Sequence, residues 1–209
     1  KKRDVFKVKK FLKIAERVDK DFTEYLYNKA EFLVLNKELN EAINILNKLI
    51  STKKDPKFFL LLSKIYFTLG DEVNGNKIIK DIFSLFPNDY SVLNFKGMRD
   101  LYEGNFEDGW KLYEFRRSAL NNLYPNIKKW NGETLKEKKI LVYNEQGIGD
   151  CIQFSKYLFP LTKLCKNIDF LVNDKISGMF NKNFKEIKIC SKENINLNEY
   201  DFKIPLGSL

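Results

Sequence analysis

The order of apolar and polar positions divides the chain into a helical part and a part where strands alternate with helices. Residues 4–20 carry apolar side chains at helical spacing with lysines between them, and similar stretches continue to about residue 124. At Lys139 the spacing changes, because Ile140–Tyr143 is an uninterrupted apolar run containing β-branched residues. Such a run is typical of a strand that is buried on both faces of a sheet.

Small residues and turns recur in the helical part with a period of 33 or 34 residues. The recurring positions are Ala30, Ser63 and Gly97; Ala42, Gly75 and Gly109; and the turns Leu69-Gly70-Asp71 and Glu103-Gly104-Asn105. Small residues let two helices cross closely, so the period predicts helical hairpins. We expect units over 23–55, 56–89 and 90–124, with residues 4–20 as the second helix of a preceding, truncated unit.

This pattern resembles the tetratricopeptide repeat (TPR), a 34-residue helix-turn-helix. In the middle unit the matching residues are Phe59, Leu62, Ser63, Tyr66, Gly70, Gly75, Ile79, Ile82 and Pro87. A generic array of helical hairpins is the alternative. The resemblance implies a superhelix whose concave groove, lined by the first helix of each unit, holds a peptide or a domain. Candidate groove residues, each of which could also be ordinary solvated surface, are Asn28, Lys29, Lys64, Asn94 and Lys96.

After Lys139 the sequence predicts a parallel α/β sheet with right-handed crossovers, and we expect no strand before residue 135. Expected strands cover 140–143, 168–172, 187–190 and 202–204, and expected helices cover 151–166 and 175–180. Gly147 and Gly149 lie where the first strand meets the first helix, which favours either a plain turn or a ligand close to backbone N–H groups. Ile152 occupies the third glycine position of a dinucleotide-binding fingerprint, so a nicotinamide cofactor is disfavoured.

Composition and charge remove several function classes. The formal net charge is +9, with nine Lys/Arg against three Asp/Glu in residues 1–20. Because these lysines alternate with apolar residues and no nucleic-acid motif is present, we expect a solvated helix face and no nucleic-acid binding; weak association with an anionic membrane surface or an acidic partner is the alternative. The chain has three cysteines without CxxC spacing and no histidine, which argues against a zinc site and excludes histidine-based catalysis. Free, buried cysteines fit a cytoplasmic protein.

Two further observations concern the ends of these parts. No stretch is long and apolar enough for a transmembrane helix, and the start Lys1-Lys2-Arg3-Asp4 suggests a cut inside a longer chain.

Trp110, Tyr113 and Trp130 cluster where the pattern changes from helical to alternating strands and helices. They either cap the repeat core or are buried at a joint between the two parts.

Several motifs together resemble a bacterial family. They are Tyr113-Glu114-x-Arg116, Trp130-Asn131-Gly132-Glu133, Asn144-Glu145-Gln146-Gly147-Ile148-Gly149-Asp150-x-Ile152-Gln153-Phe154-x-x-Tyr157 and Pro205-Leu206-Gly207-Ser208-Leu209. Over residues 104–209 the chain is similar to bacterial TPR proteins that carry a glycosyltransferase domain like the lipopolysaccharide heptosyltransferases. A more distant similarity is to the O-linked N-acetylglucosamine transferases, which join the same two module types.

The resemblance implies a two-lobed (GT-B) transferase of which this chain holds only the beginning. The implied domains are a TPR array over 1–124, a linker over 125–138 and a partial Rossmann-like acceptor lobe over 139–209. The nucleotide-sugar donor belongs to a second lobe that lies outside these residues, so the fragment alone is expected to be inactive. No other cofactor and no metal is implied.

The same resemblance assigns roles to residues after the first strand. By motif, Asp150 corresponds to the proposed general base, although an aspartate here is also a good helix N-cap. Glu145, Gln146, Gly147 and Gly149 are the candidate substrate-binding residues, and Glu145-Gln146 replaces the serine-rich turn common in heptosyltransferases. The leading hypothesis is therefore a glycosyltransferase whose repeats dock a protein or glycan acceptor. The alternative is a TPR scaffold for protein partners with a non-catalytic α/β lobe.

Overall fold

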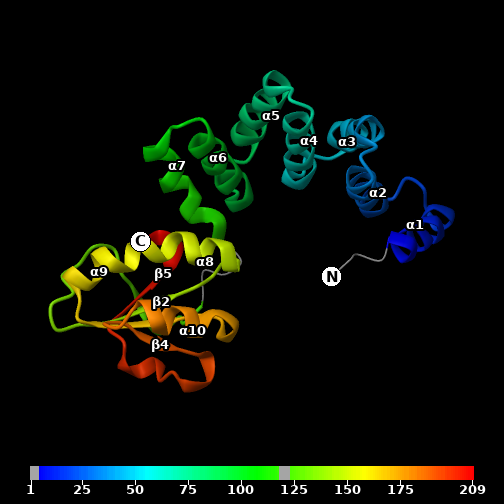
Figure 1. Cartoon of the computed structure of the whole chain (residues 1–209). Helices are drawn as coiled ribbons and strands as arrows, with labels where there is room; N and C mark the ends of the chain where they lie inside the picture. The colour runs from blue at the N-terminus through cyan, green and yellow to red at the C-terminus, as the bar shows by residue number, and fades with distance from the viewer. Residues whose placement is uncertain (1–4, 118–122) are drawn as a thin grey trace. The chain divides into compact units, whose positions relative to one another are not determined.

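The computed structural model describes residues 5–117 and 123–209, which belong to two compact units, Lys1–Ser118 and Ala119–Leu209. The first unit is a TPR-like array of helices, shown from blue to green in Figure 1, and the second contains a parallel sheet with interleaved helices. The expected fold class is therefore confirmed. Each unit is described by itself below.

The described residues of the first unit form seven α-helices and one short 3₁₀ helix. They are α1 (Val5–Val18), α2 (Thr23–Leu35), α3 (Leu39–Thr52), α4 (Pro56–Thr68), α5 (Glu72–Leu85), α6 (Tyr90–Tyr102), α7 (Phe106–Tyr113) and η1 (Glu114–Arg117). The most extensive packing within this unit is between α2 and α3, α4 and α5, and α6 and α7, which are the three hairpins that the period predicted. Helix α1 packs against α2 in the place of a preceding second helix.

Local sequence sets where these helices begin and turn. The carboxylate of Asp55 accepts the Lys57 N–H, and the carboxylate of Asp89 accepts the N–H groups of Ser91 and Val92, so each aspartate caps a helix N-terminus. Gly104 follows α6 with φ +87°, a conformation that glycine adopts without strain. These signals place the helices at the predicted period.

Close helix crossings explain the recurring small residues. Gly97 of α6 faces the backbone of α7, and a Cβ built on it would lie 2.7 Å from the Tyr113 nitrogen. In the middle hairpin Ser63 is 1% exposed, and its hydroxyl donates to the Gly75 carbonyl at 3.1 Å. The crossing at Gly97 leaves no room for a larger side chain. The main core of the array lies in α2, α3 and α4 and is formed by Ala30, Leu33, Ala42, Leu46, Leu49, Phe58, Leu62 and Ile65.

The second unit contains a five-stranded sheet in which every pairing is parallel. Its elements are β1 (Lys128–Lys129), β2 (Lys139–Tyr143), α8 (Ile148–Phe154), η2 (Ser155–Tyr157), α9 (Leu158–Leu164), β3 (Asn167–Leu171), α10 (Asp174–Asn183), β4 (Lys188–Cys190), η3 (Lys192–Asn194), η4 (Leu197–Glu199), β5 (Phe202–Pro205) and η5 (Leu206–Ser208). The strand order is β1-β5-β2-β3-β4. The chain thus leaves β2 toward β3 and later returns to its other side as β5.

The two faces of this sheet are covered differently. Ile140 and Val142 of β2 pack with Leu158 of α9 and Phe180 of α10 in the larger core. The alternate residues Leu141 and Tyr143 pack on the opposite face against irregular chain, in a smaller cluster that includes Ile127. Full burial on both faces explains why this strand reads as a continuous apolar run.

The structure corrects two expectations in this unit. Strand β1 precedes residue 135 and pairs with β5, and the expected linker 125–138 contributes the buried side chains of Ile127 and Leu135 to the unit. The single helix expected over 151–166 is divided into α8, η2 and α9. Pro160 has no N–H to donate to the carbonyl four residues before it, which accounts for the irregular turn at this point.

Candidate functional site

The helical unit has a small cavity on its inner helices. A space of about 210 Å³ lies between α4 and α6 and is closed on one side by η1. Its lining residues are Leu60, Lys64, Tyr90, Ser91, Asn94, Phe95, Met98, Phe115 and Arg116. Because α4 and α6 are the first helices of successive hairpins, this is where the TPR resemblance places a ligand.

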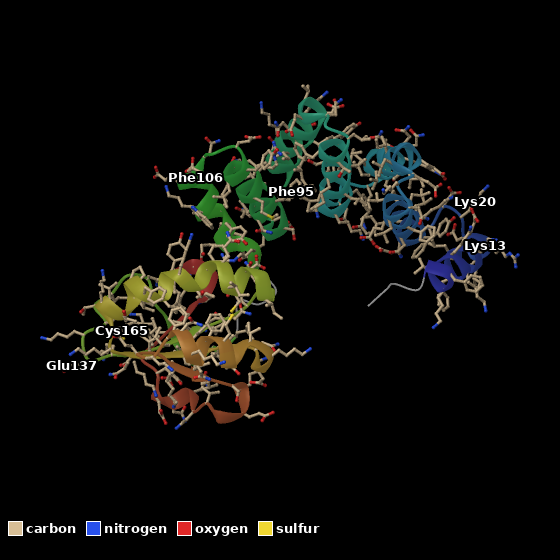
Figure 2. All side chains as sticks on the ribbon, viewed as in Figure 1. Lys13, Lys20, Phe95, Phe106, Glu137 and Cys165 are labelled. Atoms are coloured by element: carbon tan, nitrogen blue, oxygen red, sulfur yellow. The ribbon has the colours of Figure 1, made fainter. Side chains whose placement is uncertain are left out.

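Aromatic rings and cations give this cavity its character. The rings of Tyr90 and Phe115 stack at 5.6 Å between centroids, which holds η1 against α6. The Lys64 ammonium lies 5.5 Å from the centroid of the Phe95 ring, labelled on α6 in Figure 2. Arg116 is held by hydrogen bonds from Nη1 to the Tyr113 carbonyl and the Glu114 carboxylate. The cavity is therefore lined by both aromatic and polar groups, with the Lys64 ammonium and the Glu114-paired Arg116 guanidinium at its wall.

One polar atom of the cavity is unsatisfied. The side-chain oxygen of Asn94 is buried and has no hydrogen-bond partner among the described residues, while its amide nitrogen contacts the Met98 sulfur at 4.0 Å. Buried polar atoms in proteins nearly always have a partner. Rotation of the Asn94 side chain toward the cavity would let an N–H group of a bound molecule satisfy this oxygen.

Two of the five groove residues expected from sequence, Lys64 and Asn94, line this cavity. Lys29 lies 3.7 Å from Glu16 in an ion pair, and Lys96 pairs with Asp100 at 2.6 Å, so both cations neutralise carboxylates within the array. The fifth, Asn28, lines a different groove, between α1 and α2.

In the second unit a larger cavity of about 450 Å³ lies at the carboxyl ends of β2, β3 and β4. It is lined by Leu123, Tyr124, Tyr143, Asn144, Glu145, Gln146, Leu171, Val172, Asn173, Asp174, Lys192 and Glu193. The carboxyl edge of a parallel sheet is the usual ligand side in α/β proteins. Three carboxylates and one ammonium in the lining make the cavity a poor match for an anionic ligand.

The residues predicted after β2 separate into two groups. Glu145 and Gln146 line the cavity, whereas Gly147, Gly149 and Asp150 lie in the turn and first residues of α8 and are not in the lining. The Asp150 carboxylate accepts the Gly147 N–H at 3.2 Å, as a helix-capping group does. Cys151 follows Asp150 in α8 and is buried. This burial, and after it the negative charges of Glu145 and Asp150, raises the pKa of the Cys151 thiol to about 11.

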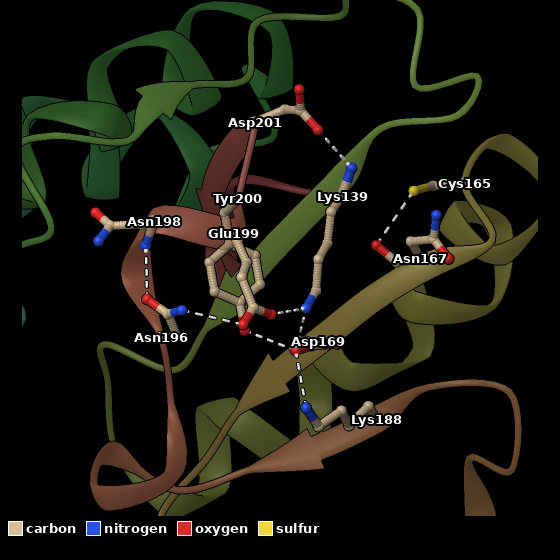
Figure 3. A network of polar contacts seen from close by, with 10 residues as sticks. All are labelled: Lys139, Cys165, Asn167, Asp169, Lys188, Asn196, Asn198, Glu199, Tyr200 and Asp201. Atoms are coloured by element: carbon tan, nitrogen blue, oxygen red, sulfur yellow. Dashed lines mark hydrogen bonds and ion pairs between the residues drawn. The ribbon is translucent and has the colours of Figure 1, made fainter.

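A polar network occupies the sheet face that lacks helices. Asp169 of β3 is 4% exposed, accepts the Tyr200 hydroxyl at 2.6 Å and lies 3.4 Å from the Lys139 ammonium (Figure 3). Burial, followed by the hydrogen bond to Asp169, raises the pKa of Tyr200. Lys139 also donates to Glu199, which lowers the pKa of that carboxyl and raises the pKa of the Lys139 ammonium. The network ties η4 and the start of β5 to the sheet.

The tryptophans expected at a joint have separate environments. Trp110 is 42% exposed and meets the Tyr113 ring edge to face at 5.6 Å. Trp130 packs on the core of its own unit, and its indole N–H donates to the Glu133 carbonyl at 2.7 Å. Gly132 in this turn has φ +97°, a conformation that glycine adopts without strain. The burial of Trp130 is therefore explained within the second unit, and a joint that buries these aromatics stays a prediction.

Two kinds of site were searched for throughout residues 5–117 and 123–209. Within these ranges no three His, Cys, Asp or Glu side chains are grouped closely enough to hold a metal ion. None of the described helices has the length and apolar character needed to cross a membrane.

Sequence reasoning did not find all of the cavity residues. Phe115 and Arg116 were missed because the third unit departs from the repeat here, with α7 ending at Tyr113 and η1 turning toward α4. Phe95 could have been found, because it lies next to Asn94 on the same inner helix.

Comparisons with known proteins give limited relationships. No family model matches the chain. Protein FlbA of Caulobacter vibrioides is 25% identical over 117 residues, an alignment that covers 52% of this chain and 20% of FlbA, so the chain spans a small part of that relative's length. A crystal structure of YrrB, described as a TPR protein with an unusual peptide-binding site, aligns with a TM-score of 0.40 and 15% identity over 58% of this chain and 64% of YrrB.

Proposed function

We propose that the helical unit is a scaffold that binds an extended peptide segment of a partner protein across α4 and α6. The observation that carries the proposal is the unsatisfied side-chain oxygen of Asn94, a residue that lines the cavity between α4 and α6. An extended peptide supplies backbone N–H groups at regular intervals, and one of them would satisfy this oxygen.

The other lining groups indicate which peptide side chains fit. Leu60, Phe95 and Met98 offer an apolar surface for one bulky side chain. Lys64 adds a positive charge at the wall, which favours a carboxylate beside that side chain, whereas the Arg116 guanidinium already pairs with Glu114 at 3.0 Å. We therefore propose an apolar residue next to an acidic one as the bound motif, and a cytoplasmic location belongs to the same proposal.

Selection from a random peptide library displayed on phage, with the whole chain as bait, tests this function. Enriched peptides are then measured by fluorescence anisotropy against wild type, Asn94→Leu and Lys64→Glu. Loss of one hydrogen bond worth about 0.5–1.5 kcal/mol predicts about 2–10-fold weaker binding for Asn94→Leu.

The matched control is Lys80→Glu, which makes the same charge reversal at an exposed position of the outer helix α5. It should bind like wild type apart from a small electrostatic effect at low salt. Failure to enrich any peptide, or equal binding by wild type, Asn94→Leu and Lys64→Glu, would refute the proposal.

A second candidate function concerns the α/β unit. We propose that it is the acceptor-side lobe of a glycosyltransferase, with a nucleotide-sugar bound by residues outside this chain. Support comes from the cavity at the carboxyl edge of the sheet, where Glu145 and Gln146 lie beside two tyrosine rings. In this proposal Asp150 orients the acceptor hydroxyl and takes its proton, in addition to capping α8.

Sugar transfer by the native polypeptide that contains this chain tests the second function. Asp150→Asn keeps a capping side chain but cannot accept a proton, so a base role predicts about 10²–10⁴-fold slower transfer with unchanged melting temperature. Wild-type turnover in a normally folded Asp150→Asn protein would leave only the capping role.

A further inference from the structure

An uncommon backbone conformation shapes the wall of the cavity at the carboxyl edge of the sheet. Tyr124 has φ +61°, in the left-handed region that a bulky side chain rarely adopts. The buried Lys203 ammonium of β5 donates to the carbonyls of residues 123 and 124 at 2.8 and 2.7 Å, which holds the chain in this conformation. Backbone strain of this kind is concentrated at binding and active sites. Here it places the Tyr124 ring in the cavity wall, edge to face with the Tyr143 ring at 5.3 Å.

The two tyrosine rings give the cavity an aromatic wall. Tyr143 is 5% exposed and lies beside the buried side chains of Leu171 and Val172, which also line the cavity. Burial, and after it the neighbouring Tyr143, raises the pKa of Tyr124, so its hydroxyl stays protonated at neutral pH. Neutral aromatic rings attract both the C–H groups of a ligand and a cation placed over the ring face.

Side-chain amides supply the polar part of the wall. The Asn144 amide nitrogen donates to the Gln146 carbonyl at 2.9 Å, and the Asn173 side-chain oxygen accepts the Lys175 N–H at 3.0 Å. The other side-chain atoms, the Asn144 oxygen and the Asn173 nitrogen, form no hydrogen bond with the residues that the structure describes. They offer one acceptor and one donor, which is the pair that a hydroxyl group requires.

Charge decides what kind of ligand fits between these walls. The lining contains the carboxylates of Glu145, Asp174 and Glu193 and a single ammonium, that of Lys192. Within residues 5–117 and 123–209, neither Asp174 nor Glu193 has an ion-pair partner, and one ammonium can neutralise only one carboxylate. The excess negative charge attracts a cation and repels an anion.

We propose that this cavity binds a small hydroxylated ligand that carries a protonated amine, the chemical class of the amino sugars. The amine lies at the carboxylates of Asp174 and Glu193, the hydroxyls meet Asn144 and Asn173, and the apolar face of the ligand lies on the tyrosine rings. The volume of about 450 Å³ lies within the range of about 300–1,000 Å³ that is usual for small-molecule sites. As a statement about a sugar acceptor, this inference rests on the glycosyltransferase function proposed above.

Three methyl glycosides that differ at one group test the ligand class. They are the glucosaminide, the glucoside and the glucuronide, which carry an ammonium, only hydroxyls, and a carboxylate. Amide resonances of the whole chain are followed by NMR during titration with each. We expect the glucosaminide to shift the amides of residues 143–146 and 171–174 and to bind at least about tenfold more tightly than the glucoside, with the glucuronide weakest. The preference should shrink as salt is raised.

Glu193→Gln removes one charge from the lining and keeps the size of the side chain. It should weaken glucosaminide binding at least about threefold and leave glucoside binding unchanged. The matched control is Glu186→Gln, the same substitution at an exposed position of the same unit outside the lining, which should bind like wild type. Both glutamates are exposed, so both variants should fold.

Several results would overturn the inference. They are equal binding of the glucosaminide and the glucoside, tightest binding of the glucuronide, an absence of shifts at the cavity, or a glucosaminide preference that Glu193→Gln leaves intact. Failure of the glycosyltransferase function gives a different result. Amine-selective binding without sugar transfer by the native polypeptide would keep the site and remove the acceptor role, whereas sugar transfer without amine selectivity would do the reverse.

Discussion

Substitution of Gly97 by alanine is the sharpest test of how the repeats pack. A Cβ at this position of α6 would lie 2.7 Å from the Tyr113 nitrogen and 2.8 Å from the Leu112 carbonyl carbon, both backbone atoms of α7. Ordinary contact needs about 3.4 Å or more, so α7 must move away from α6 because no flexible side chain can yield. Overpacking of this kind costs about 1–3 kcal/mol.

Alanine also has a favourable effect that must be subtracted. In the middle of a helix it stabilises by about 0.5–1 kcal/mol relative to glycine. Because the obstruction at Gly97 is backbone, we take the upper part of the overpacking range and expect a net loss of about 1–2 kcal/mol for the hairpin of α6 and α7. This corresponds to amide hydrogen exchange that is about 5–30-fold faster in both helices.

Hydrogen exchange followed by mass spectrometry resolves these helices separately from the rest of the chain. Gly178→Ala is the matched control, because Gly178 lies within α10 and has no atom within 4 Å of a built Cβ. It should slow exchange in α10, since only the helix propensity changes. If Gly97→Ala slowed exchange in α6 in the same way, the close-crossing explanation of the recurring small residues would be wrong.

Three further predictions follow from the second unit. Burial raises the pKa of the Cys151 and Cys190 thiols to about 11 each. Both thiols should therefore resist a disulfide reagent at pH 8 in the native protein and react after denaturation in urea. Rapid labelling of the native protein would contradict their burial. A hydrogen bond from the Asn131 N–H, followed by one from Lys128, lowers the pKa of the Glu133 carboxyl from 4.5 to about 2. The ionised carboxylate therefore stabilises the fold above pH 4.5, and this stabilisation is lost as the pH falls toward 2. An NMR titration of the carboxyl carbon with a midpoint near 4.5 would refute this. The buried Lys203 ammonium donates to the carbonyls of residues 123 and 124 at 2.8 and 2.7 Å. Its replacement by methionine should therefore lower the free energy of unfolding by about 1–3 kcal/mol and speed amide exchange near β1. Unchanged exchange there would show that these two hydrogen bonds are unimportant.

The repeat period and the class change were predictable because both rest on local rules. Aspartate caps such as Asp55 and Asp89 and turn glycines act within a few residues of the chain, and the small residues act between the two helices of one hairpin. The apolar run at Ile140–Tyr143 likewise predicted a central strand, because burial on both faces requires apolar residues at every position.

The candidate site was only partly predictable. Lys64 and Asn94 were found because they face inward on the first helices of their hairpins. Phe115 and Arg116 reach the same cavity only because the chain departs from the repeat geometry after α7. Such a departure cannot be predicted from the repeat period. Asp150 was expected as a helix N-cap, but the N-cap is Gly147 and Asp150 is the third residue of α8, where it lies outside the lining of the cavity at the sheet edge.

Sequence by itself determined which segments are helices or strands, since capping, turn formation and apolar periodicity are read over short stretches. Tertiary structure decided which surfaces those elements leave open. The two-residue strand β1 has no pattern of its own and exists because β5 offers it an edge. The groove beside α1 and the unsatisfied Asn94 oxygen also arise only when separate helices meet, because burial is a property of neighbours and not of residue order.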